Sequence, residues 1–287
     1  MAEILKGIDV TSSINSRTCA LVNELRSKGV IPTLCIIRVG EKPDDLTYEN
    51  GAVKRASTVG VDVVKRVFPV DVSEEKLIST IQDINNDAGI HGVLIFRPLP
   101  KHINEARVCN ALNPAKDMDG ITDISMAGVY SQKPLGYPPC TAQAVLELLS
   151  HYGIELSGKN VTVIGRSLVI GKPVSMMLLK SNATVTICHT RTKHLSEVAR
   201  KADIIVAAAG CARMVTKDFV RDEQVIVDVG INWDDAVGRI VGDVDFDSVS
   251  DIVSAITLVP GGVGGVTTSV LMSHVAEAAR LMCKTEE

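Results

Sequence analysis

The stretch VTVIGRSLVIGKPVSMML, residues 161–178, decides the fold. It predicts a short buried strand, a turn that contains Gly165 and Gly171, and a helix with Pro173 in its first turn. Glycine suits a turn where backbone amides approach a phosphate, because free N–H groups and the helix dipole favour an anion there. The motif is not GxGxxG, since Ser167 stands in place of the second glycine, so it also fits an ordinary strand-to-helix turn.

On both sides of this turn, short β-branched runs alternate with helical patterns. Towards the C-terminus the runs are TVTICH, DIIVAAAG and QVIVDVG, and before residue 114 they are PTLCIIRV, VDVVKRVFP and GVLIFRP. Repeated strand and helix units predict parallel sheets with the helices packed on them. Between residues 114 and 140 the pattern gives way to a loop rich in Pro, Gly and Asp. A chain of 287 residues is long for one core, so we expect two α/β domains.

Composition narrows the class of partner. The net charge of -4, with no long basic run, argues against a nucleic-acid or anionic membrane surface and favours a small-molecule ligand. The seven cysteines lack CxxC spacing, which is typical of reduced thiols. The six histidines show no ligand spacing, so we expect no metal site. Without a signal-like start or a long apolar run, a soluble cytoplasmic protein is expected.

The strand after the glycine turn indicates which dinucleotide would bind. In an NAD site this strand usually ends at Asp or Glu, which holds the ribose hydroxyls. Here it ends at His189, Thr190 and Arg191, and Arg166 lies in the turn itself. Because arginine binds phosphate through two hydrogen bonds, NADP is favoured, with NAD possible. The alternative is that Arg191 is a solvated loop charge.

Further motifs carry a resemblance to a known family. GRSLVIGKP, TVTICHT, ADIIVAAAG, VIVDVGIN, GDVDF and ITLVPGGVGGVT, with KDMDGIT and PPCT upstream, resemble the bifunctional methylenetetrahydrofolate dehydrogenase/cyclohydrolase family over nearly the whole chain. The resemblance implies an N-terminal α/β catalytic domain at residues 1–140, rejoined by a last helix at 266–287. It also implies a C-terminal Rossmann-type parallel-sheet domain at 141–265, a folate cleft between the domains, and a homodimer paired through the nucleotide domains.

The resemblance also implies site residues. The family's cofactor contacts fall on Gly165, Arg166, Ser167, Thr190 and Ile231, and further cofactor contacts are expected at Gly171, His189, Arg191, Gly210 and Thr267. The folate contacts are expected at Tyr48, Ala52, Phe96, Pro98, Asp119, Pro260, Gly261 and Gly262. Tyr48 is expected to stack on the folate, and Asp119 to hydrogen-bond the pterin.

The sequence departs from the family in one respect. Most members carry YVxxK and a later QLPLP, whose lysine and glutamine pair, whereas here Ala52 and Phe96 occupy those two positions. Removing a hydride from a methylene carbon between two nitrogens is a problem of orientation and needs no base. Hydrolysis of the methenyl product needs a proton shuttle, for which a desolvated lysine is suited. We therefore expect dehydrogenase activity with weak or lost cyclohydrolase activity.

Alternatives stay open at this point. Lys54 is expected about 120° away from Tyr48 on a helix, but it would reach the site if the helix began late or bent at Gly51. Tyr48, Lys54 and Asp119 are thus the candidate catalytic residues. A nucleotide sensor without catalysis is a second alternative. A hydroxy-acid or amino-acid dehydrogenase would need a Lys and Asp pair that we do not find, and Arg97 has no assigned role.

Overall fold

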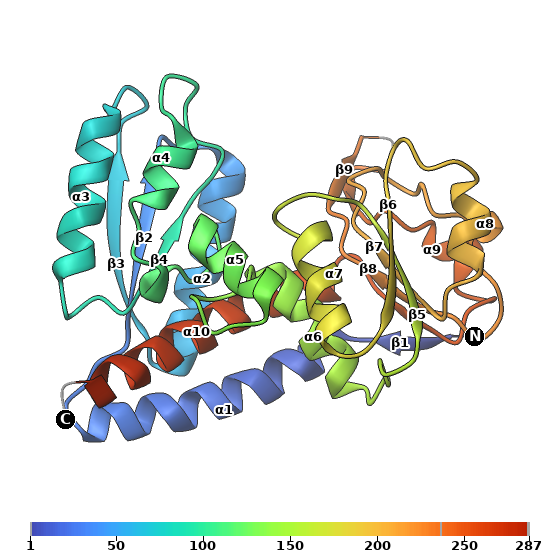
Figure 1. Cartoon of the computed structure of the whole chain (residues 1–287), viewed down its shortest axis with the longest axis horizontal. Coiled ribbons are helices and arrows are strands. Elements are labelled where there is room, and N and C mark those ends of the chain that lie inside the picture. The colour runs from blue at the N-terminus through green and yellow to red at the C-terminus, as the bar shows by residue number, and fades with distance from the viewer. Residues whose placement is uncertain (1, 236, 286–287) are drawn as a thin grey trace. The chain divides into compact units, whose positions relative to one another are not determined.

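The computed structural model describes residues 2–235 and 237–285, and the chain divides into two compact units (Figure 1). The first unit, here the nucleotide unit, contains the chain up to Ser12 and Thr141–Thr267. The second, here the catalytic unit, contains Ser13–Cys140 and the chain from Thr268 onward. The two-domain α/β prediction is confirmed.

The nucleotide unit is built on a six-stranded sheet in the order β1-β11-β8-β7-β5-β6, and all of its pairings are parallel. The strands are β1 (Glu3–Leu5), β5 (Asn160–Ile164), β6 (Thr184–Cys188), β7 (Ile204–Ala207), β8 (Val225–Asp228) and β11 (Ala255–Thr257). Between them run α7 (Gly171–Lys180), α8 (Leu195–Arg200), η2 (Lys217–Phe219) and α9 (Phe246–Val249), with an antiparallel hairpin of β9 (Asn232–Asp234) and β10 (Arg239–Val241). β7 is buried throughout, as expected of a parallel strand covered on both faces.

The first residues of the chain differ from expectation. Residues 1–140 were assigned together to the catalytic domain, but β1 pairs with β11 at the edge of the six-stranded sheet. Leu5 is fully buried there. Pairing between strands about 250 residues apart leaves no local signal, so only the folded chain reveals it.

The catalytic unit has a parallel three-stranded sheet in the order β3-β2-β4. Its strands are β2 (Thr33–Val39), β3 (Asp62–Phe68) and β4 (Gly92–Ile95). Its helices include α2 (Pro43–Val59), α3 (Glu74–Asn86), α4 (Glu105–Asn110), η1 (Pro114–Lys116) and α5 (Asp123–Ser131). Leu77, Ile81 and Ile84 on α3 recur at helical spacing and pack into the core with residues of β2 and β4.

Three helices span the boundary between the units in sequence: α1 (Gly7–Ser27), α6 (Cys140–His151) and α10 (Val263–Thr285). From Thr268 onward α10 belongs to the catalytic unit. A Cβ atom added at Gly92 of β4 would meet Val275 of α10 at 2.9 Å, so the helix packs closely on this strand. The prediction that the last helix rejoins the N-terminal domain is confirmed.

The helix that carries Tyr48 has clear ends. Pro43 is in its first turn together with Asp44 and Asp45, and proline and acidic residues both favour a helix N-terminus. It ends at Gly60, which has the left-handed conformation (φ 81°) that glycine adopts without strain. The helix runs from Pro43 to Val59 and includes Gly51, so it neither begins late nor stops at the glycine.

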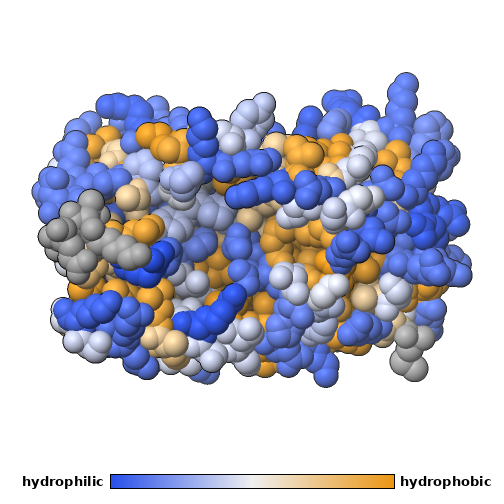
Figure 2. All heavy atoms as spheres, turned by 60° about the horizontal axis from the view of Figure 1, so that its bottom comes forward, coloured by the Kyte–Doolittle hydropathy of each residue, from blue (hydrophilic) through white to orange (hydrophobic). Residues whose placement is uncertain are grey.

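Polar side chains cover most of the face shown in Figure 2, with apolar patches between them. Within residues 2–235 and 237–285, no helix has the length and apolar character needed to cross a membrane.

Candidate active site

Tyr48, Phe96 and Asp119 come from three segments of the catalytic unit. Tyr48 lies in the second turn of α2, Phe96 directly follows β4, and Asp119 lies in the loop after η1. The rings of Tyr48 and Phe96 meet edge to face, with centroids 5.8 Å apart and planes at 82°. Such pairs contribute about 0.5–1.5 kcal/mol beyond their buried area. The ring that replaces the family's glutamine thus supports the tyrosine.

The Asp119 carboxylate is held by the backbone. Its Oδ1 accepts a hydrogen bond of 2.9 Å from the amide of Cys140, the first residue of α6. The loop is shaped by Asp117, which is fully buried and accepts hydrogen bonds from the amides of Ile121 (3.0 Å) and Thr122 (2.8 Å). A carboxylate fixed in this way is a suitable acceptor for N–H groups of a heterocyclic ligand.

The two polar groups of this site are electrostatically coupled. Burial raises the pKa of the Tyr48 phenol well above its usual value, and the nearby charge of Asp119 raises it further. Burial also raises the pKa of Asp119, although the hydrogen bonds of Cys140 and the charge of Arg97 oppose this shift. Both effects favour the neutral form of the Tyr48 phenol, which is a hydrogen-bond donor.

The structure separates Lys54 from Tyr48. Ala52 is fully buried one turn after Tyr48, so a methyl group occupies the position next to the ring. Lys54 is exposed, six residues after Tyr48 in an unbroken helix, and therefore points about 120° away. Neither condition under which Lys54 was expected to reach the site is met.

Sequence reasoning gave no role to three residues near the site, Arg97, Tyr137 and His274. Arg97 is partly buried, and its Nη1 lies 3.7 Å from Oε1 of Glu105, whose Oε2 accepts a 2.8 Å hydrogen bond from the Leu99 amide. His274 of α10 has its Nδ1 2.9 Å from the Met118 carbonyl oxygen, and its ring lies 5.0 Å from that of Tyr137. The contact of His274 with Met118 joins residues 156 apart in the chain, and such contacts leave no pattern in one sequence.

In the nucleotide unit, the turn from Gly165 to Gly171 follows β5 and opens α7. Gly165 has φ 136°, a conformation that favours glycine, and a Cβ atom there would overlap the Ala208 carbonyl oxygen. A Cβ atom at Gly171 would overlap the backbone of Gly165. Arg166 and Ser167 are exposed at this turn, and Ser167 Oγ accepts a 3.1 Å hydrogen bond from the Ile170 amide. The close turn before a helix, with an exposed guanidinium, fits a dinucleotide phosphate.

The end of β6 forms a second turn of the same unit. The His189 amide donates to Thr192 Oγ1 (2.9 Å), and the Arg191 amide donates to His189 Nδ1 (3.1 Å). Thr190 and Arg191 are exposed. Because β5 and β6 are paired in parallel, their carboxyl ends, and hence these two turns, lie at the same edge of the sheet.

The other predicted cofactor residues differ in accessibility. Gly210 and Ile231 are exposed, and Ile231 has 66% of its surface accessible. Thr267 is buried at 6% exposure, and its hydroxyl donates to the Val263 carbonyl oxygen of its own helix (3.4 Å). The side chain of Thr267 is therefore turned inward within α10.

The predicted folate residues fall in both units. Pro98 is exposed in the catalytic unit, after a cis peptide bond. Pro260, Gly261 and Gly262 lie in the nucleotide unit, where the Gly7 amide donates to the Gly261 carbonyl oxygen (2.8 Å). Pro260 and Gly261 are exposed and Gly262 is buried. Their contacts with a ligand stay a prediction.

A parallel sheet with a glycine turn at its carboxyl edge is characteristic of nucleotide-binding α/β proteins. Here a second α/β unit adds a phenol and a fixed carboxylate. The profile of the tetrahydrofolate dehydrogenase/cyclohydrolase catalytic domain matches residues 5–119, and that of the NAD(P)-binding domain of the same family matches residues 139–283. The chain belongs to this family, which confirms the resemblance.

Full-length relatives support this assignment. The bifunctional protein FolD of Carboxydothermus hydrogenoformans is 48% identical over 283 residues, which cover 98% of this chain and 99% of the relative. The crystal structure of FolD from Campylobacter jejuni superposes with a TM-score of 0.95 at 36% identity and covers 98% of this chain and 99% of its own. A Trypanosoma brucei FolD complexed with NADP cofactor and inhibitor gives a TM-score of 0.92 at 32% identity, with 99% of both chains covered.

Proposed function

We propose that the protein oxidises 5,10-methylenetetrahydrofolate to 5,10-methenyltetrahydrofolate with NADP, and that its cyclohydrolase activity is weak or absent. The observation that carries the second part is the surroundings of Tyr48, where a fully buried Ala52 and the ring of Phe96 stand in the positions of the family's lysine and glutamine. Family membership carries the first part. NADP, with NAD possible, is supported by the matching NAD(P)-binding domain and by Arg166 and Arg191 at the sheet edge.

The residues around Tyr48 suit the oxidation step and do not suit the hydrolysis step. NADP supplies the acceptor for the hydride that leaves the methylene carbon, and the nitrogens on both sides of that carbon stabilise the resulting cation. No proton is abstracted, so the protein has to bind and orient the folate. Tyr48 offers a neutral phenol and an aromatic face, and Asp119 offers a hydrogen-bond acceptor. Both groups can hold the ligand, and neither of them has to act as a base with a shifted pKa.

Hydrolysis requires more. Water must attack the methenyl carbon, and a proton must then move to a ring nitrogen, which calls for a group that gains and loses protons near neutral pH. The raised pKa of the Tyr48 phenol makes it poorly suited to this role. Loss of one positioned acid or base typically lowers a rate about a hundred- to ten-thousandfold. We therefore propose that methenyltetrahydrofolate leaves this protein largely unhydrolysed.

A direct assay follows reduced cofactor and methenyl product separately by absorbance. We expect NADPH to form while methenyltetrahydrofolate accumulates and clears at the rate of buffer alone. The Ala52→Lys, Phe96→Gln double variant should gain cyclohydrolase activity, with the two single variants as controls. Methenyl clearance that scales with the concentration of wild-type enzyme would reject the proposal.

The same assay separates the two alternatives. Lys54→Met should leave both rates unchanged, because Lys54 is exposed and points about 120° away from Tyr48 on α2. If wild-type protein hydrolyses the methenyl compound and Lys54→Met does not, the enzyme is bifunctional through Lys54. A protein that binds NADP but turns over no folate would be the nucleotide sensor.

We also propose a homodimer formed through the nucleotide unit, as the resemblance implies. β6 is the outer strand of the six-stranded sheet, and Ile187 on it and Leu179 on α7 are exposed, which supports a partner on this face. Light scattering should give twice the chain mass of 30.6 kDa. Ile187→Glu should shift the mass to that of one chain, and an unchanged dimer would exclude this face.

A further inference from the structure

Two carboxylates are buried at the carboxyl edge of the nucleotide unit, and no role has yet been given to them. Asp228 is the last residue of β8 and is 3% exposed, and Asp243 follows β10 and is fully buried. Asp228 accepts hydrogen bonds from the amides of Gly230 (2.9 Å), Asp243 (3.0 Å) and Val244 (2.9 Å). The first carboxylate thus fixes the backbone of the second.

Asp243 in turn holds two segments that contain predicted cofactor contacts. Its Oδ2 accepts hydrogen bonds from the amides of Ala209 (2.6 Å) and Gly210 (2.9 Å). Its Oδ1 accepts from the Cys211 amide (2.9 Å) and from Asn232 Nδ2 (2.9 Å). One side chain therefore ties the loop after β7 to the segment after β8, where Ile231 precedes Asn232.

Glycines make this close packing possible. A Cβ atom at Gly230 would overlap the carboxylate of Asp243, and one at Gly242 would overlap the carboxylate of Asp228. Each aspartate thus occupies the space that a side chain at the facing position would need. The arrangement allows almost no movement of either carboxylate.

The loop held by Asp243 lies against the phosphate-binding turn. The Ala208 amide donates to the Ile164 carbonyl oxygen (2.8 Å), and Gly165 is packed on Ala208. We propose that Asp243, itself fixed by Asp228, is a positioning residue for the nicotinamide nucleotide, because it holds residues 209–211 and Asn232 so that Gly210 and Ile231 face the cofactor. This inference rests on the proposed function.

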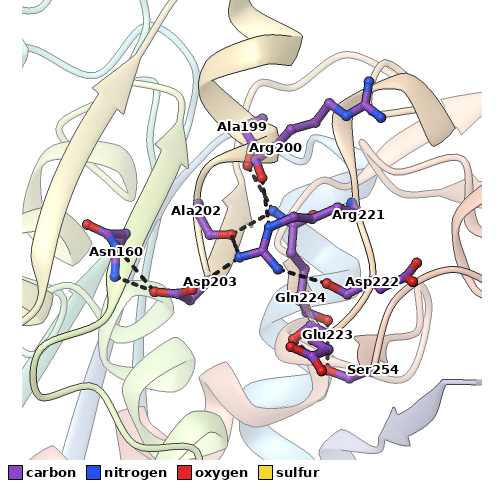
Figure 3. Close-up of polar contacts among 10 residues, drawn as sticks. All are labelled: Asn160, Ala199, Arg200, Ala202, Asp203, Arg221, Asp222, Glu223, Gln224 and Ser254. Atoms are coloured by element: carbon purple, nitrogen blue, oxygen red, sulfur yellow. Dashed lines mark hydrogen bonds and ion pairs between the residues drawn. The ribbon is translucent and has the colours of Figure 1, made fainter.

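A carboxylate that merely stabilises the fold would behave differently, and the same sheet offers a control in Asp203, whose side chain is 36% exposed. Figure 3 shows a polar cluster around Asp203 and Arg221, which lies at the amino ends of β5, β7 and β8. Asp203 accepts a hydrogen bond from the Asn160 amide (2.9 Å) and pairs with Arg221 (3.2 Å). It ties neighbouring strands together, as Asp243 does, but at the edge opposite the phosphate-binding turn.

The test is direct titration of the protein with NADPH, followed by fluorescence and by calorimetry. Asp243→Asn keeps the shape of the side chain but replaces one acceptor oxygen by an NH2 group that faces N–H donors. We expect its dissociation constant for NADPH to rise ten- to a hundredfold. At saturating NADP, kcat and the KM for the folate should stay within threefold of wild type. Asp203→Asn should lower the melting temperature and leave the dissociation constant unchanged.

A second variant perturbs the Asp243 carboxylate without replacing Asp243 itself. Gly230→Ala places a methyl group against Asp243 and should weaken NADPH binding in the same way, also if Asp243→Asn fails to fold. If both variants bind NADPH as tightly as wild type does, the inference is overturned while the proposed function stands. Equal weakening by Asp203→Asn also overturns it, since the effect would then be general destabilisation. If wild-type protein binds neither NADPH nor NADH, the proposed function fails and the inference with it.

Discussion

Replacement of Glu49 by glutamine should destabilise the catalytic unit strongly. Glu49 follows Tyr48 on α2, and its side chain is 4% exposed. Its Oε2 lies 2.8 Å from Arg38 Nε, and its Oε1 lies 2.7 Å from Lys65 Nζ. Arg38, on β2, is also buried and donates to the Gly40 carbonyl oxygen. Glu49→Gln would leave the Arg38 charge buried without a counter-ion.

The exposure of the two partners sets the magnitude. Breaking a buried pair by removing one charge costs about 3–5 kcal/mol, because the remaining ion loses both water and its partner. Lys65 is 41% exposed, so its pair with Glu49 is largely screened by water and contributes about 0–1 kcal/mol. We therefore expect the free energy of unfolding to fall by about 3–5 kcal/mol for Glu49→Gln and by at most about 1 kcal/mol for Lys65→Gln.

Hydrogen exchange of peptides from α2 and β2, measured by mass spectrometry, reports the local free energy of unfolding. A matched control is the Arg38→Met, Glu49→Leu double variant, which removes both charges and should lie closer to wild type than Glu49→Gln does. Because α2 carries Tyr48, Glu49→Gln should also raise the KM for the folate while the dissociation constant of NADPH stays unchanged. A loss for Glu49→Gln no larger than that for Lys65→Gln would refute the reasoning.

Three further predictions concern other charged groups. Burial raises the pKa of Asp228 from 3.8 to about 6, so its ionisation costs stability that is progressively lost as the pH rises from about 4 to about 6. The free energy of unfolding of wild type should therefore gain about 2 kcal/mol relative to Asp228→Asn between pH 8 and pH 4, and a flat difference in urea unfolding would contradict this. Lys116 Nζ donates hydrogen bonds of 2.8 and 2.7 Å to carbonyl oxygens at the end of α3, and Lys116→Met removes both. The free energy of unfolding should fall by about 2–4 kcal/mol, and an unchanged melting temperature would show that Lys116 does not stabilise the end of α3. Arg97→Leu removes a charge that opposes the raised pKa of Asp119, so the KM for the folate should rise more at pH 6 than at pH 8, and a parallel shift at both pH values would count against it.

Glu49 adds a pH dependence of the opposite sign to that of Asp228. Burial opposes its ionisation, but the hydrogen bonds and charges of Lys65 and Arg38 outweigh burial and lower its pKa below 4.5. This stabilisation is therefore present above pH 4.5 and is lost as the pH falls through the lowered pKa. Acid unfolding of wild type and Glu49→Gln should converge below that range.

The folded chain corrected some expectations for identifiable reasons. Thr267 was predicted to contact the cofactor because a hydroxyl follows the glycine loop, but its side chain is buried and donates to the Val263 carbonyl oxygen of its own helix. Lys54 was kept as a candidate because the start of its helix was uncertain. An unbroken helix from Pro43 leaves it exposed. For Lys54, the position of the helix start, which sequence patterns locate poorly, decided where the side chain points.

Local patterns in the sequence alone determined the parallel α/β architecture, the glycine turn at Gly165 and the apolar residues Ala52 and Phe96 in place of polar ones. These features depend on residues close together along the chain, where periodicity and turn chemistry act. Only the tertiary structure decided that β1 joins the six-stranded sheet of the nucleotide unit, that the Cys140 amide holds Asp119, and that Asp243 ties two loops together. Such contacts join segments about 20 to 250 residues apart, and a single sequence carries no periodic trace of them because each depends on how the whole chain packs.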